Sequence, residues 1–205
     1  MKLALRHLAA ATVLVASSSS WAAAVFTSSS AFLAQVEPGA YTETFNSVVD
    51  ANTNVQSFSG PGGFGYTATL PSGQQFYFGA SALSTNQPNV PVTLTFTGTA
   101  VTAIGGHFYA IDIGDAFLSA PVSIGLSDGT TETFTPGSAA SYRGYTSSVA
   151  ITSLTFSSGA PGAYATVDNL TIGTAIANQS VPEPGTVALV GLALVGLMAT
   201  RRRDA

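Results

Sequence analysis

The sequence predicts an all-β body, an antiparallel β-sandwich, between an N-terminal signal peptide and a single C-terminal transmembrane helix. Three observations support this prediction. Short runs of β-branched and aromatic residues alternate with turn residues through the middle of the chain. That middle part shows no sustained helical period with caps. Each end, in contrast, carries an uncharged apolar run beside basic residues.

Residues 1–24 have the three parts of a secretory signal peptide. Lys2 and Arg6 form the basic part, 8–16 form the apolar part, and Ala22-Ala23-Ala24 offers an Ala-x-Ala cleavage site. We expect cleavage after Ala24, with Ala23 as the near alternative. The segment therefore predicts export, with the Sec translocon and signal peptidase as partners; a permanent N-terminal anchor is the alternative.

The region between the two ends is long enough for one domain with its own core. Residues 25–40 are small and polar, and we expect them to form a flexible N-terminal segment. Residues 41–175 are predicted to form the β-sandwich domain. Residues 176–181 then form a linker to the tail, which comprises residues 182–205.

About ten runs in the body predict strands. The clearest is 92–97, where apolar residues alternate with threonines. Asp128-Gly129 between two β runs predicts a hairpin. A long aromatic strand is predicted to be kinked at Gly105-Gly106. The predicted strands are 41–49, 64–70, 75–79, 92–97, 101–113, 122–126, 130–135, 141–146, 149–157 and 163–173.

Two of these runs change their apolar side midway. An inserted residue restores the apolar face after such a change. We therefore predict β-bulges near Thr152-Ser153 and near Asp168-Asn169.

The body has very few charges. Arg143 is its only Lys or Arg between residues 25 and 180, against eight acidic residues, which gives a charge of −7 (one minus eight). Because phosphate binding needs clustered cations, nucleic acid and anionic lipid are disfavoured as partners. Divalent cations, sugars and other neutral polymers remain. The chain has no cysteine, so disulfides and thiolate chemistry are excluded.

Few residues of the body could carry catalysis. His107 is its only histidine, and no Gly-x-Ser-x-Gly motif singles out a serine. Asp112, Asp115 and Glu132 could supply the carboxylate pair that glycoside hydrolysis needs, but solvent-facing acids in turns are the simpler interpretation. We therefore expect no enzymatic activity.

Arg143 lies between two tyrosines, Tyr142 and Tyr145, and has two interpretations. The three side chains could form a ligand-binding patch that stacks on sugar rings. Alternatively, Arg143 forms a structural ion pair with Asp112, Asp115 or Glu132 at the edge of the sandwich, which we favour.

The last 25 residues combine three features. Pro182-Glu183-Pro184 cannot continue into a regular helix, because each proline fixes its φ and removes a donor. Residues 185–200 carry no charge and predict a short transmembrane helix, and Arg201-Arg202-Arg203 then forms a cytoplasmic stop. A buried core helix is the alternative interpretation of 185–200. If 185–200 is a transmembrane helix with its arginines in the cytoplasm, the body lies on the other side of the inner membrane.

This tail resembles the sorting signal of PEP-CTERM proteins, which are exported by Gram-negative bacteria. The resemblance implies that the tail helix anchors the body in the periplasm until exosortase, a membrane-embedded enzyme, removes it. It also implies a later location at the cell surface or outside the cell, in association with exopolysaccharide and biofilm matrix.

Residues 103–173 also resemble jelly-roll, carbohydrate-binding-like sandwiches. In such domains an acid from an early strand and an Asp from the last strand commonly meet at a structural calcium ion, the one cofactor we consider. Glu43 and Asp168 occupy these positions, although Asp168 could instead cap its own bulge. The sequence thus predicts a non-enzymatic surface or matrix protein, with a carbohydrate-binding module, or a polysaccharide hydrolase, as the alternative.

Overall fold

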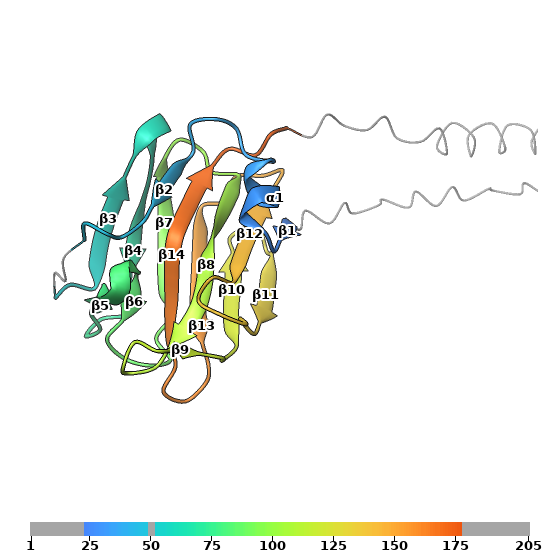
Figure 1. Cartoon of the computed structure of the whole chain (residues 1–205). Helices are drawn as coiled ribbons and strands as arrows, with labels where there is room; N and C mark the ends of the chain where they lie inside the picture. The colour runs from blue at the N-terminus through green and yellow to red at the C-terminus, as the bar shows by residue number, and fades with distance from the viewer. Residues whose placement is uncertain (1–22, 49–51, 178–205) are drawn as a thin grey trace, which may run out of the picture.

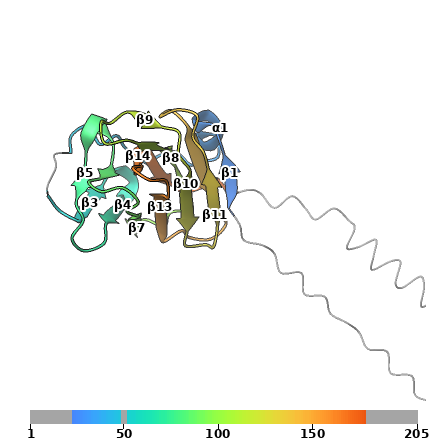
Figure 2. The same cartoon turned by 90° about the horizontal axis from the view of Figure 1, so that it is seen from below.

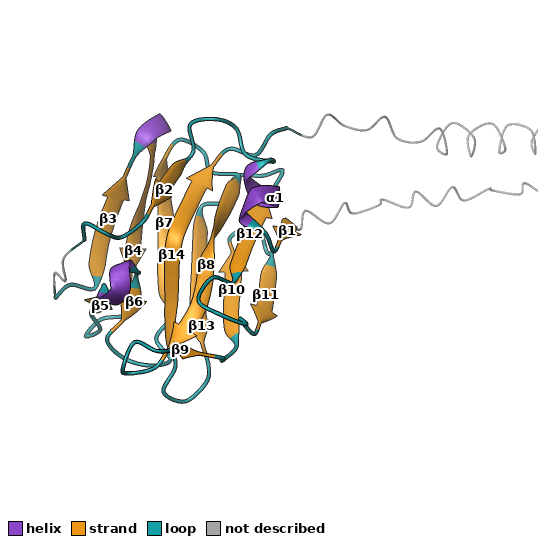
Figure 3. Cartoon of the chain, viewed as in Figure 1, coloured by secondary structure: helices purple, strands orange, loops and turns teal. Residues whose placement is uncertain are grey.

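The computed structural model describes residues 23–48 and 52–177. The predicted signal peptide, except its last two residues, and the sorting tail lie outside these residues. Figure 3 shows strands throughout the described part and only short helical segments. Every strand pairing in it is antiparallel, which confirms the predicted all-β class.

The strands form two six-stranded sheets and one small hairpin. Sheet I has the order β1-β12-β8-β14-β2, with β9 paired to β8. Its strands are β1 (Ala24–Phe26), β2 (Tyr41–Glu43), β8 (Ala103–Ile111), β9 (Phe117–Leu118), β12 (Tyr142–Thr146) and β14 (Tyr164–Gly173).

Sheet II has the order β11-β10-β13-β7-β4-β3. Its strands are β3 (Val55–Ser59), β4 (Phe64–Thr69), β7 (Val92–Gly98), β10 (Val122–Leu126), β11 (Thr131–Phe134) and β13 (Ser153–Ser158). The hairpin consists of β5 (Phe76–Tyr77) and β6 (Ser84–Thr85). Two single 3₁₀ turns, η1 (Pro61–Gly63) and η2 (Gly79–Ser81), complete the described elements together with the helix α1 (Ser29–Leu33).

The two sheets pack face to face around one apolar core. Figure 2 shows β8 and β14 in one layer and β7 and β13 in the other. Across the interface, the ring of Phe108 on β8 meets that of Phe156 on β13 edge to face, with the centroids 5.6 Å apart. Both rings are fully buried. The packing is that of a β-sandwich; its jelly-roll, carbohydrate-binding-like character stays a prediction.

Most predicted strands are present with slightly different ends. The hairpin at Asp128-Gly129 joins β10 to β11 as predicted; Gly129 has φ +93°, which glycine adopts without strain. β3 and the short strands β1, β6 and β9 were not predicted. The run 41–49 forms a strand only over Tyr41–Glu43.

Of the two predicted bulges, one is present. The register of β14 against β8 shifts between Asp168 and Thr171, and Asn169 takes a left-handed φ of +50°. The prediction of a bulge near Thr152-Ser153 was wrong, because β13 begins only at Ser153 and pairs in regular register. The change of apolar side there marks the entry into the strand. Likewise, the pairing of Gly105-Gly106 with β12 is regular, and the irregularity lies opposite, in β14.

The segment 25–40, predicted to be flexible, is instead part of the folded body. β1 pairs with β12, and α1 packs on the outer face of sheet I. Phe32 of α1 is fully buried there, above the paired glycines Gly105 and Gly144. A Cβ on Gly144 would come within 2.5 Å of the Phe32 ring, so glycine is required for this contact. The small and polar composition of 25–40 gave no sign that Phe32 is buried against sheet I.

The described chain begins and ends at the same end of sheet I. Ala24, Thr146, Ala103 and Gly173 pair in one row across β1, β12, β8 and β14. Figure 1 shows the chain leaving β14 near this end. The backbone N–H of Ala23 donates to Thr130 Oγ1 at 2.9 Å, so cleavage after Ala24 would remove a residue that contacts the body.

No helix within residues 23–48 and 52–177 is long and apolar enough to cross a membrane. The predicted transmembrane helix at 185–200 lies outside these ranges.

The helix α1 offers a test of this packing with its own control. Phe32→Ala should lower the free energy of unfolding by about 3–5 kcal/mol, because it empties a filled site under the helix. The neighbouring Leu33 is 48% exposed, and Leu33→Ala should change the free energy by no more than about 0.5 kcal/mol. Urea unfolding followed by circular dichroism measures both. Equal effects would show that α1 does not dock.

Buried tyrosines should make the protein sensitive to alkali. Burial raises the pKa of Tyr109 to about 12, and burial also raises the pKa of Tyr41, Tyr66, Tyr142 and Tyr145. Unfolded tyrosines ionise near pH 10. The folded state therefore holds more protons above pH 10, and stability that is complete below pH 10 is lost as the pH rises towards 12.

We expect tyrosinate absorbance from these five residues to rise together with the loss of the circular dichroism signal. Ionisation of all tyrosines while the sheet signal remains intact would contradict the burial of these rings.

Candidate functional site

A cavity of about 190 Å³ lies at the end of sheet I where β8 ends and β14 begins. We call it the distal cavity. The β5–β6 hairpin and the loop from β8 to β9 close its sides, and Figure 1 shows β5, β6 and β9 at this end, away from the point where the chain leaves β14. The side chains that matter for its chemistry are Tyr77, Asn86, Asp112, Ile113, Asp115 and Tyr164.

Hydrogen bonds fix the acidic side chains of the distal cavity. Asp112 Oδ1 accepts the backbone N–H groups of Gly114 and Ala116, at 2.8 and 3.0 Å, and so holds the loop after β8. Asp115 Oδ2 accepts the hydroxyl of Tyr77 at 2.6 Å, which ties this loop to the hairpin. The second oxygens, Asp112 Oδ2 and Asp115 Oδ1, make no hydrogen bond to the described residues.

Asn86 is fixed in the same way. Its Oδ1 accepts the backbone N–H of Gln75 at 3.0 Å, and its own backbone N–H donates to the carbonyl of Gln75. The amide nitrogen Nδ2 makes no hydrogen bond to the described residues and remains a donor. The cavity combines two tyrosine rings, an exposed aliphatic side chain, two carboxylates and one amide.

Two larger hollows adjoin the parts of the chain outside the described residues. One is lined by Ala24, Thr146 and Ala177, next to both ends of the described body. The other is lined by Tyr41, Glu43 and Val48, next to residues 49–51. The distal cavity is lined by residues away from those parts of the chain, and we take it as the candidate site.

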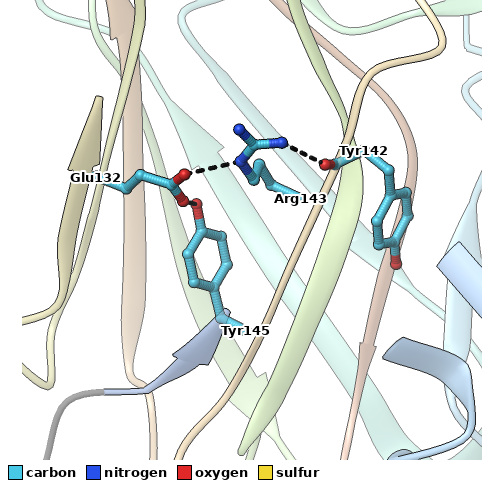
Figure 4. Close-up of polar contacts among 4 residues, drawn as sticks. All are labelled: Glu132, Tyr142, Arg143 and Tyr145. Carbon is cyan, nitrogen blue, oxygen red and sulfur yellow. Dashed lines mark hydrogen bonds and ion pairs between the residues drawn. The ribbon is translucent and has the colours of Figure 1, made fainter. Parts of the chain in front are cut away.

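The predicted patch of Tyr142, Arg143 and Tyr145 is a structural cluster. Arg143 Nε lies 2.8 Å from Glu132 Oε1, and Figure 4 shows the guanidinium between Glu132 and the carbonyl of Tyr142. The guanidinium also lies 3.8 Å above the ring of Phe134. This ion pair joins β12 of sheet I to β11 of sheet II, and Glu132 is the partner among the three acids considered.

The two tyrosines of the cluster do not face a ligand. Tyr145 is fully buried and donates its hydroxyl to Glu132 Oε2 at 2.7 Å, as Figure 4 shows. Tyr142 points to the other face of sheet I, where its ring packs against Phe32 and edge to face with His107. The three side chains therefore do not form one ligand-binding surface.

Glu43 and Asp168, predicted as a calcium pair, are not brought together. Glu43 pairs with Leu170, whose side chain is in the core, whereas Asp168 pairs with His107 on the outer face. Residues directly opposite in an antiparallel pair share one face of the sheet, so the two carboxylates lie on opposite faces of sheet I. Within the described ranges, no group of three Asp, Glu or His side chains could hold a metal.

Each of these carboxylates has a local role. Glu43 accepts the hydroxyl of Tyr41 and, at 2.8 Å, the N–H of Phe45. Asp168 accepts the backbone N–H and the side-chain amide of Asn169, and so caps its own bulge. Burial raises the pKa of Asp168, and the amide of Asn169 and the nearby His107 lower it in part.

The sequence analysis named Asp112 and Asp115 but missed Tyr77, Asn86 and Tyr164. These three come from the hairpin and the start of β14, segments far apart in the sequence. Phe76-Tyr77-Phe78 was visible as a β run, but no local pattern connects it with Asp115. Only the tertiary structure brings these side chains together.

The body is an all-β domain of antiparallel sheets with its chain ends close together. A family model described as the PEP-CTERM protein-sorting motif matches residues 180–203. The comparisons with curated proteins and with solved structures found no match to the chain. The match confirms the resemblance of the tail and marks the chain as a PEP-CTERM protein, an exosortase substrate. The protein is therefore exported, with a C-terminal sorting signal that anchors it in the membrane.

The Arg143 cluster predicts an effect on stability. Glu132→Ala should lower the free energy of unfolding by about 2 kcal/mol, because Arg143 and the buried Tyr145 hydroxyl both lose their partner. Glu37 is exposed and makes no salt bridge with described residues, so Glu37→Ala should stay within about 0.5 kcal/mol. Thermal and urea unfolding measure both variants. A Glu132 variant as stable as the wild type would reopen the ligand-binding interpretation.

Proposed function

We propose that this protein is a non-enzymatic surface or extracellular-matrix protein that associates with exopolysaccharide in the biofilm of a Gram-negative bacterium. The observation that carries the proposal is the sorting motif at 180–203. In this scheme the Sec translocon exports the chain and signal peptidase removes residues 1–24. The tail helix then holds the body in the periplasm until exosortase releases it to the cell surface or beyond.

The placement of the chain ends supports this scheme. Because β14 ends in the same row as Ala24, the body would hang from the membrane by one end of sheet I. The nine residues of β8 separate that end from the distal cavity by about 27 Å. The cavity would then face away from the membrane, both before and after the tail is removed.

The chemistry of the described body supports a role without catalysis. His107 serves packing against Tyr142, and Glu132 is bound to Arg143. Asp112 and Asp115 do line one cavity, as a hydrolase would require, but their hydrogen bonds serve the loop and Tyr77. A general acid needs an apolar surrounding that keeps it protonated, whereas Asp115 is exposed.

The alternative of a carbohydrate-binding module has one observation in its favour. Such a module would carry Tyr, Phe and Asn at a loop rim, and the distal cavity has Tyr77, Asn86 and Tyr164 at such a rim. The two roles are compatible, because a matrix protein needs a contact with its polymer.

Processing of the tail can be tested in the producing cells. The mature wild-type protein should lack Arg201-Arg202-Arg203 when its C-terminus is determined by mass spectrometry. Glu183→Ala should accumulate at full length in the membrane fraction, because the Pro-Glu-Pro region presents the cleavage segment. Asp204→Asn, just beyond the matched motif, is the control and should be processed as the wild type. Finding only intact Asp204-Ala205 ends in the mature protein would contradict the proposal.

A further inference from the structure

The distal cavity lies where three segments that are far apart in the sequence meet. Tyr77 comes from the hairpin, Asp112 and Asp115 from the loop after β8, and Tyr164 from the first position of β14. Ile113 beside them is 84% exposed, although it is a large apolar side chain. We propose that this cavity binds one uncharged sugar ring of a polysaccharide.

The tyrosines and Ile113 suit the apolar face of a sugar ring. A tyrosine presents a large, rigid surface with little side-chain entropy to lose, and it adds a hydroxyl at its tip. Tyr77 is held in place by its bond to Asp115. Because that ring is already ordered, binding need not order it further.

The polar groups suit the hydroxyls of the same ligand. The unused oxygens of Asp112 and Asp115 are acceptors, and Nδ2 of Asn86 is a donor. Their orientation is set by bonds within the protein, so the acceptors and the donor are pre-arranged. A sugar hydroxyl both donates and accepts, which matches such a mixed set.

Charge decides which sugars fit. No Lys, Arg or His lines the cavity, and Arg143, the only Lys or Arg between residues 25 and 180, is bound to Glu132. Two carboxylates beside each other repel a third anion. Uronic acids and sulfated or phosphorylated sugars are therefore disfavoured, and uncharged rings are selected.

Size limits the ligand to a single ring. Pockets that enclose drug-sized ligands measure about 300–1,000 Å³, and the distal cavity measures about 190 Å³. A site of this size takes the end or a side branch of a polymer and binds it weakly. Useful retention then needs several protein copies on one polymer. The inference deepens the proposed function and rests on it for the source of the sugar, but not for the site itself.

Binding can be measured on the processed protein purified from the producing cells. Saturation-transfer difference NMR with glucose, galactose, mannose and glucuronic acid gives the affinity for each. At least one uncharged hexose should bind, and glucuronic acid should bind at least about tenfold more weakly. Equal binding of glucuronic acid, or no hexose binding at all, would overturn the assignment. Calcium binding without sugar binding would overturn it as well.

Three variants assign the site. Tyr164→Ala should weaken hexose binding about tenfold, the loss expected when a central aromatic contact is removed. Tyr77→Phe keeps the ring and removes its bond to Asp115, so it should weaken binding severalfold with little effect on folding. Asp115→Asn should reduce the discrimination against glucuronic acid, a change that a purely structural role would not cause.

Phe117→Ala and Glu37→Gln are the controls, because both residues are exposed and neither lines the cavity. Circular dichroism verifies the fold of each variant. Unchanged hexose binding in Tyr164→Ala and Tyr77→Phe would overturn the proposal.

Co-sedimentation with exopolysaccharide from the same cells separates the two proposals. If the wild type and Tyr164→Ala sediment equally with the polymer, the matrix association stands and the cavity assignment fails. If hexoses bind but no protein sediments with the polymer, the cavity assignment stands and the matrix association fails. Release of reducing sugar from the polymer would contradict the non-enzymatic role.

Discussion

The antiparallel ladder between β8 and β14 is the interaction on which the arrangement of the whole body depends. The two strands run side by side from Ala103 paired with Gly173 to Ile111 paired with Tyr164. Their inner faces supply Phe108 and Val167 to the core. The outer face of β8 contacts α1, and the edge of β14 pairs with Leu83 beside β6. Because this ladder is long and continuous, it fixes the exit of the chain at one end and the distal cavity at the other.

A body with a single cation and no cysteine must obtain its stability mainly from packing and backbone hydrogen bonds. It has no cysteine, and its single Arg143 is placed where it joins the two sheets instead of facing solvent. The bond to Glu132 and the contact with Phe134 close the edge of the sandwich next to β11. The body therefore offers a partner shape, aromatic rings and hydroxyl groups, with almost no positive charge.

The sequence predicted those features that depend on local pattern. The strands at 92–97 and 122–126 were recognised because their apolar residues alternate, and the bulge at Asp168-Asn169 because that alternation changes side. β3 was missed since Phe58 alone is buried among its five residues. The burial of Phe32 could not be predicted, because the glycines that admit its ring lie more than seventy positions away.

The difference between local pattern and contacts across the fold also explains which site residues were predicted. Arg143 was correctly given an acidic partner as the favoured interpretation, because a sole cation in an acidic body is more often structural, and Glu132 was among the three acids named. Glu43 and Asp168 were paired by analogy, and the register placed them on opposite faces. The distal cavity depends on three separate segments, the hairpin, the loop after β8 and the start of β14, which meet only after the β8–β14 ladder forms. The sorting motif is therefore one continuous stretch of sequence, whereas the proposed sugar site exists only in the folded body.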